Sequence, residues 1–165
     1  MERKELEQRR QMVVQTHTQF YKLILALGDE FGLGKVLNVV AKWRFGEGKG
    51  VGARLKEELD VTGDSPEDFI RIWQEHGKMV GIECEVFKDA DGNIVFRHAG
   101  FCPCLAAIGK AKAPWELICP NWGWPYIEGM LYAVNPDLKL IPPSELRWRA
   151  KGDKFCDHKL VVAGE

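Results

Sequence analysis

Residues 1–80 carry apolar side chains at the three- and four-residue spacing of amphipathic helices. A long helix is predicted over residues 2–31, with an apolar stripe made of Met12, Val13, Phe20, Leu23, Ile24 and Leu27. Glycines at positions 28, 32 and 34 predict its end. Further helices are predicted over residues 35–45 and 51–59.

Residues 46–52 read Gly-Glu-Gly-Lys-Gly-Val-Gly. This segment lacks the spacing and the terminal Lys-Ser/Thr of a phosphate-binding loop, and it follows a predicted helix rather than a strand. Because glycine permits backbone angles that other residues avoid, the pattern predicts a flexible connector. Ser65, Pro66 and Asp68 then predict a capping box that starts a fourth helix, which ends near Val80.

From Ile82 onward the apolar positions alternate, which is typical of strands. A hairpin is predicted with its turn at residues 89–93, and its second strand places Ile94, Phe96 and His98 on one face. Short helical runs are predicted at 105–108 and 115–119, followed by a helix over 121–134. Two closing strands are predicted, one over 145–150 and one over 155–162.

The order of these elements predicts an α+β protein. We expect the N-terminal helices to pack on an antiparallel sheet formed by the C-terminal half. The length predicts a single domain over residues 1–165. Within it, residues 1–80 would be mainly helical, and residues 81–165 would form the sheet with a cysteine-rich helical insert.

Composition and charge limit the kinds of partner that the protein is expected to bind. Hydrophobic residues make up 45% of the chain, charged residues 28%, and the net charge is −1, which is normal for a soluble protein and argues against nucleic acid as a partner. The charged N-terminus does not resemble a secretory signal, and no stretch approaches the ~18 apolar residues of a membrane span. We therefore expect a cytoplasmic protein without a membrane partner. The polar start of the first helix leaves open a homo-oligomer formed through that helix.

Candidate chemistry concentrates between His98 and His158, where four of the five cysteines and four of the six tryptophans lie. Cys156 and His158 are two residues apart on a predicted strand, so both side chains point to its apolar side. One interpretation is a cysteine nucleophile activated by imidazole. A second is a site for zinc or another soft metal, with candidate ligands His98, Cys102, Cys104, Cys119 and Cys156. A third is a set of inert thiols around a ligand pocket.

Two further groups could contact a small-molecule ligand. Trp122 and Trp124 belong to the dense aromatic run 121–126, which could form either core or the wall of an apolar pocket. Arg147 and Arg149 alternate with apolar residues, and either could be solvated or could hold a substrate carboxylate.

Four landmarks in the second half occur in the order of a known family. They are Cys102-Pro103 after a strand, the single Cys119, Asn135-Pro136 after a helix, and the closing run Gly152-Asp-Lys-Phe-Cys-Asp157. With these motifs the chain resembles the L-2-amino-thiazoline-4-carboxylic acid hydrolase family and, more distantly, the 4-vinyl reductase domain. The helical first half is similar in layout.

The resemblance implies an α+β small-molecule-binding domain that opens a cyclic amidine with water, by hydrolysis of a non-peptide C–N bond. On this basis Cys119 or Cys156 is the predicted nucleophile, or a metal held by the cysteines activates water, and His158 is the predicted base. The alternative implied by the reductase-type domain is a non-enzymatic metal- or thiol-based sensor. The extra thiol of Cys104, the Pro-Asn-Trp-Gly after Cys119 and His158 after Cys-Asp depart from the family pattern and favour metal binding.

Overall fold

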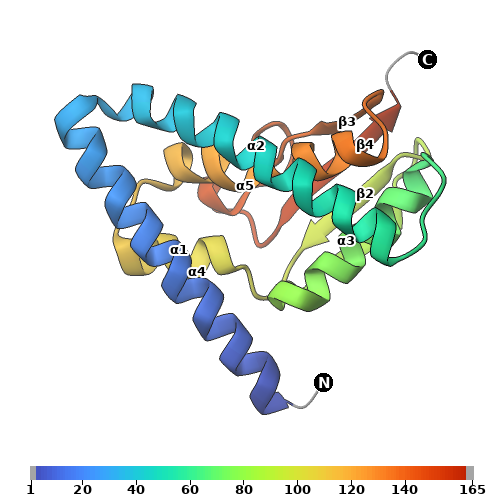
Figure 1. The fold of residues 1–165 in the computed structure, drawn as a ribbon, viewed down its shortest axis with the longest axis horizontal. Coiled ribbons are helices and arrows are strands. Elements are labelled where there is room, and N and C mark those ends of the chain that lie inside the picture. The colour runs from blue at the N-terminus through green and yellow to red at the C-terminus, as the bar shows by residue number, and fades with distance from the viewer. Residues whose placement is uncertain (1–2, 163–165) are drawn as a thin grey trace.

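The computed structural model describes residues 3–162, and it begins with two long helices. α1 (Arg3–Phe31) and α2 (Leu33–Glu58) meet at Gly32 and form an open V (Figure 1). The φ of Gly32 is 88°, in the left-handed region that glycine tolerates best. The predicted first helix is confirmed from Arg3 onward, while its predicted first residue, Glu2, lies outside the described residues.

The glycine-rich segment 46–52 lies inside α2, so the predicted flexible connector and the predicted break between two helices are wrong. In a helix, residues four apart share a face. Gly48 and Gly52 are buried against α5 (Trp115–Val134), whereas Gly46 and Gly50 are exposed. A Cβ atom on Gly48 would overlap the carbonyl oxygen of Tyr126 on α5. The alternating glycines therefore serve close helix packing on one face of α2.

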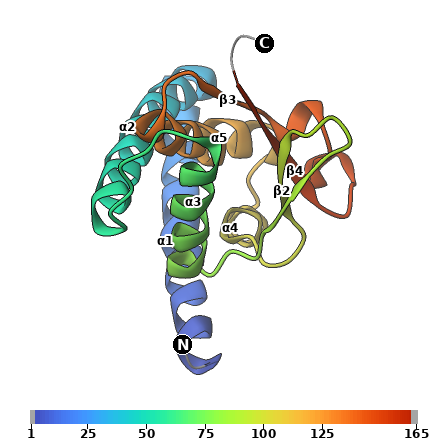
Figure 2. The same ribbon diagram turned by 90° about the vertical axis from the view of Figure 1, so that its right-hand side faces the viewer.

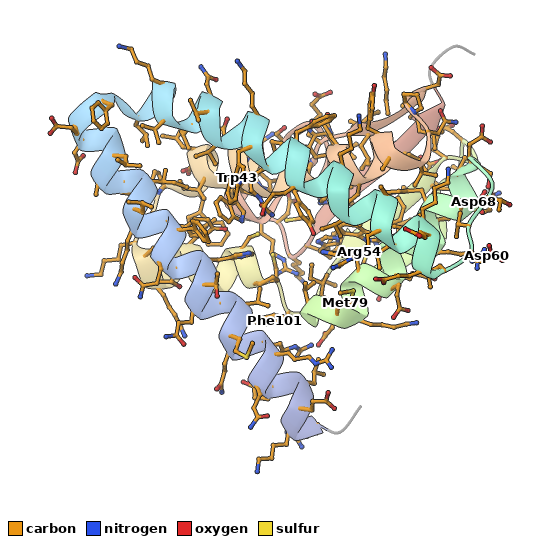
Figure 3. The ribbon with its side chains drawn as sticks, in the orientation of Figure 1. Trp43, Arg54, Asp60, Asp68, Met79 and Phe101 are labelled. Atoms are coloured by element: carbon orange, nitrogen blue, oxygen red, sulfur yellow. The ribbon has the colours of Figure 1, made fainter. Side chains whose placement is uncertain are left out.

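The predicted start of the next helix, α3 (Pro66–Val80), is confirmed in detail. The Ser65 hydroxyl accepts a hydrogen bond from the Asp68 backbone N–H at 3.2 Å, and the Asp68 carboxylate accepts one from the Ser65 N–H at 3.1 Å. This reciprocal pair satisfies backbone donors that a helix start leaves unpaired. Asp60 and Asp68 mark the two sides of the connection from α2 to α3 (Figure 3).

Within residues 3–162, four strands form one antiparallel sheet in the order β1-β2-β4-β3. The predicted hairpin is confirmed, and the strands are β1 (Glu85–Lys88), β2 (Ile94–His98), β3 (Leu138–Ile141) and β4 (Cys156–Val162). The predicted strand over 145–150 is wrong. Residues 143–151 instead contain two 3₁₀ turns, Pro143–Glu145 and Arg149–Lys151, and the first of them begins after Pro142. The strand that pairs with β4 at this edge of the sheet is β3, where Leu138 and Leu140 are buried.

Two helices connect the strands. α4 (Pro103–Ala111) lies between α1 and the sheet (Figure 2). α5 is a single helix that covers both of the helical segments predicted at 115–119 and 121–134, although Pro120 and Pro125 lie inside it. Phe101, just before α4, lies beside α1 (Figure 3), and the Arg10 guanidinium is 4.6 Å from its ring centroid.

The buried apolar side chains form two groups. One lies between the sheet and the helices α2, α3 and α5, and includes Phe69, Phe96 and Met130. The other joins α1, α2, α4 and α5, and includes Tyr21, Ile108 and Trp122. The predicted α+β class, with N-terminal helices packed on a C-terminal antiparallel sheet, is confirmed. Among residues 3–162, none of the helices is both long and apolar enough to cross a membrane.

A buried glycine and an exposed glycine of α2 provide a matched test of the packing role. Gly48→Ala should lower the free energy of unfolding by about 2 kcal/mol or more, because the added methyl group must push α5 away. Gly50→Ala, whose Cβ would meet no atom within 4 Å, should raise it by up to about 1 kcal/mol through helix propensity. Urea unfolding followed by circular dichroism measures both, and equal effects would contradict the packing role.

Candidate functional site: a pocket of thiols and imidazoles

A cavity of about 420 Å³ lies where the two apolar groups meet. It is lined by residues of α1 to α5, of β2 and β4, and of the segment between β3 and β4. Most of the wall is apolar, which is typical of a site for a small organic molecule.

The reactive side chains of the protein converge on this cavity. All four histidines and four of the five cysteines line it, although they lie on six different elements and in the loop before α4. Of the residues predicted from the sequence, the pocket brings together His98, Cys102, Cys104, Cys119, Trp124, Arg149, Cys156 and His158. The fifth cysteine, Cys84, is half-buried before β1 and does not line the pocket.

Two predicted substrate-binding residues lie elsewhere. Trp122 is fully buried in the helical core, with its ring 5.1 Å from that of Tyr21 and 5.3 Å from that of His17. Arg147 is exposed, and its guanidinium lies 5.1 Å from the ring of Phe155. The structure therefore assigns Trp122 to packing and keeps Arg147 away from the pocket.

Aromatic and imidazole rings form a continuous series along one wall. The Tyr126 hydroxyl and His76 Nε2 are 3.0 Å apart and share a hydrogen bond. From there, ring centroids follow one another at 4.9–5.7 Å in the order His76, Trp73, His98, His158 and Trp124. The outer face of His158 is covered by Trp124, whose ring is nearly parallel to it at 12°.

Burial keeps these imidazoles neutral. It lowers the pKa of His76 and of His98 from 6.5 to about 4, and it lowers that of His158 well below 6.5. His98 Nε2 and His158 Nδ1 are buried and have no hydrogen-bond partner within residues 3–162. Buried polar atoms normally find partners, so these two nitrogens are unsatisfied hydrogen-bonding groups on residues that line the pocket.

The thiols at the start of α4 are not equivalent. Cys102 is the N-cap residue and Cys104 lies in the first turn, where unpaired backbone N–H groups favour negative charge. The neighbouring Cys102 thiol lowers the pKa of Cys104, and Cys104 in turn raises that of Cys102. The nearby Tyr21 hydroxyl also lowers the pKa of Cys104. Cys104 Sγ faces Gly123 of α5, where an added Cβ would lie 3.8 Å away.

The predicted nucleophiles sit in a different environment. Burial raises the pKa of Cys119 to about 12 and also raises the pKa of Cys156. The Cys156 sulfur accepts a hydrogen bond from the Arg149 backbone N–H at 3.4 Å. Both residues are therefore held as neutral thiols, and Cys104 is the thiol whose ionisation is favoured. In the sequence, Cys-Pro-Cys directly before a helical run is the signal that could have indicated this.

The guanidinium groups of Arg44 and Arg149 reach the pocket, and they differ in whether a carboxylate neutralises their charge. Arg44 is paired with Glu47 at 2.6 Å and lies 4.2 Å from the Tyr126 ring centroid. Arg149 donates to the carbonyl oxygens of His98 at 2.5 Å and Gly100 at 3.0 Å. Its Nε is buried without a partner, and none of the ion pairs within residues 3–162 includes Arg149. The pocket therefore contains one uncompensated positive charge.

The donors do not fit the predicted metal site. Within the part of the chain that the structure describes, no three or more His, Cys, Asp or Glu side chains are arranged to hold a metal ion. Cys102 and Cys104 interact with each other, and the Cys156 sulfur faces a backbone N–H. We therefore derive no chemistry through zinc.

Comparisons with family models, with curated proteins and with solved structures find no match for this chain. The resemblance described above therefore stays a prediction.

The neutral histidines predict a loss of stability in acid. Unfolding lets each one bind a proton near pH 6.5, whereas His76 and His98 resist protonation to about 4 in the folded state. The free energy of unfolding should therefore fall as the pH drops from about 6.5 toward 4, by up to about 1.4 kcal/mol per pH unit for each histidine. Urea titrations across this range measure the slope. His98→Gln should make the slope shallower, and an unchanged slope would contradict the explanation.

Proposed function

We propose that the protein binds a small cyclic amidine that carries a carboxylate and hydrolyses one of its C–N bonds. One observation carries the proposal: an ionisable thiol, neutral imidazoles and an unpaired guanidinium line the same apolar pocket. The resemblance to the aminothiazoline carboxylate hydrolases supports the same substrate class. The nucleophile that we propose is Cys104 rather than Cys119 or Cys156.

Arg149 would bind the carboxylate of the substrate. Arg149 is half-buried, and its Nε is fully buried without a partner within the described residues. Partial loss of hydration without a counter-charge is costly, and an incoming carboxylate offsets that cost. Because two carbonyl oxygens already fix its Nη2 atom, the guanidinium is held in one orientation before the ligand arrives. The carboxylate would then orient the ring against the Trp124 and His158 side of the pocket.

The Cys104 thiolate would add to the amidine carbon, and the ring C–N bond would break as its nitrogen takes up a proton. This step leaves the carbon bound to the Cys104 sulfur. Water would then attack that carbon, with His158 accepting its proton, and the Cys104 thiolate would leave. The proton that the ring nitrogen takes up comes from solvent, and His158 returns the proton of the attacking water to solvent. The cycle therefore consumes one water and regenerates the enzyme. His158 suits this step because its imidazole is neutral and its Nδ1 has no other partner within the described chain.

The direct test is turnover of 2-amino-thiazoline-4-carboxylate by the wild type and by single Cys→Ser variants. Cys104→Ser should lower kcat by at least about 100-fold, because a serine hydroxyl is not ionised at neutral pH. Cys84→Ser is the matched control, since Cys84 does not line the pocket, and it should keep full activity.

Cys119→Ser and Cys156→Ser complete the series and should retain most of the activity. A loss of turnover confined to either of them would restore the nucleophile predicted from the sequence. Tight binding without turnover by the wild type would instead support the alternative, a ligand-binding module.

The role of Arg149 has its own matched pair. Arg149→Gln should raise KM by about 10-fold or more, because the carboxylate loses a charged hydrogen-bond donor. Arg147→Gln, two residues away and exposed, should leave KM unchanged. Steady-state kinetics with both variants measures this, after circular dichroism has established that they fold. Equal KM values would exclude Arg149 as the anchor.

A further inference from the structure

Cys102 and Cys104 are placed so that a disulfide could join them. Two residues that are two apart in sequence have Cα atoms no more than about 7 Å apart, and disulfides usually need roughly 4.4–6.8 Å. Cys102 has extended backbone angles, with φ −131° and ψ 117°, and Pro103 fixes the first helical position after it. Both side chains line the same cavity.

Both thiols can be reached from the pocket. Each is half-buried and lines the cavity, and the buried Pro103 between them anchors the start of α4. The cavity wall is mostly apolar and its imidazoles are neutral. A small uncharged molecule would therefore enter it more easily than a highly charged one.

We propose that Cys102 and Cys104 are a redox-active dithiol that reduces small neutral organic disulfides and is itself oxidised to an intramolecular disulfide. The Cys104 thiolate attacks one sulfur of the disulfide R–S–S–R, forms a mixed disulfide and releases RS⁻. Cys102 then gives up its proton and attacks the Cys104 sulfur, which releases the second RS⁻. The protein loses two electrons, the small disulfide gains them, and two molecules of RSH form.

The environments of the thiols agree with these roles. The attacking residue is the one whose pKa is lowered, and its neighbour stays protonated until it resolves the mixed disulfide. Cys119 and Cys156 line the same pocket but are poor attacking groups, because burial raises the pKa of each. The closed disulfide would also remove the nucleophile of the proposed hydrolysis, so the same reaction would switch that activity off.

The test uses the full chain, reduced and freed of reductant, with excess hydroxyethyl disulfide at neutral pH. In the wild type, the mass of the intact protein should fall by two hydrogen atoms. After tryptic digestion, the loss should lie in the single peptide from His98 to Lys110 that contains both cysteines. No hydrolase substrate is present, so the result does not depend on the proposed function.

Variants separate the two roles. Cys102→Ser should stop at a mixed disulfide on Cys104, and Cys104→Ser should react at least about 10-fold more slowly than the wild type. Cys119→Ser, the matched control within the pocket, should close the Cys102–Cys104 disulfide at the wild-type rate. A wild-type protein that keeps a stable mixed disulfide, or that joins either residue to Cys119, would overturn the proposal.

Discussion

The close approach of α2 and α5 is the contact on which the rest of the protein depends. No side chains separate the two backbones where the helices meet, because the residues there are glycines. Gly48 and Gly52 on α2 face α5, and Gly129 on α5 faces the carbonyl oxygen of Phe45. This contact places Arg44 of α2 over the ring of Tyr126 of α5. It also fixes α5 beside the sheet, so that the pocket forms between the two apolar groups.

The pocket concentrates the unsatisfied polar atoms of the protein. Ring nitrogens of His17, His76, His98 and His158 and the Nε of Arg149 are buried without partners within the described residues. Leaving such groups unpaired costs stability. A ligand that supplies the missing hydrogen-bond partners would recover part of this lost stability. The cavity is therefore better explained as a binding site than as a packing defect.

Differences among identical residues decide the chemistry that we propose. Cys104, Cys119 and Cys156 line one pocket, and burial opposes the thiolate at all three; only at Cys104 do a neighbouring thiol and a helix start outweigh it. The same distinction supports both proposals. The Cys104 thiolate can attack an amidine carbon. Because the Cys102 thiol lies two residues away in sequence, the same thiolate can also take part in a complete disulfide exchange.

Local patterns were enough to predict the first helix, the helix α3 with its capping box at Ser65, the hairpin and the strand that carries Cys156 and His158, because each depends on neighbours in sequence. They also predicted which side of the sheet those two residues face. The chain alone did not reveal that the glycines of residues 46–52 pack a helix, or that β3 rather than residues 145–150 pairs with β4. Nor could it distinguish Arg149 from Arg147, or Cys104 from Cys119. Those differences arise from burial and from partners on distant elements, and only the folded chain brings these together.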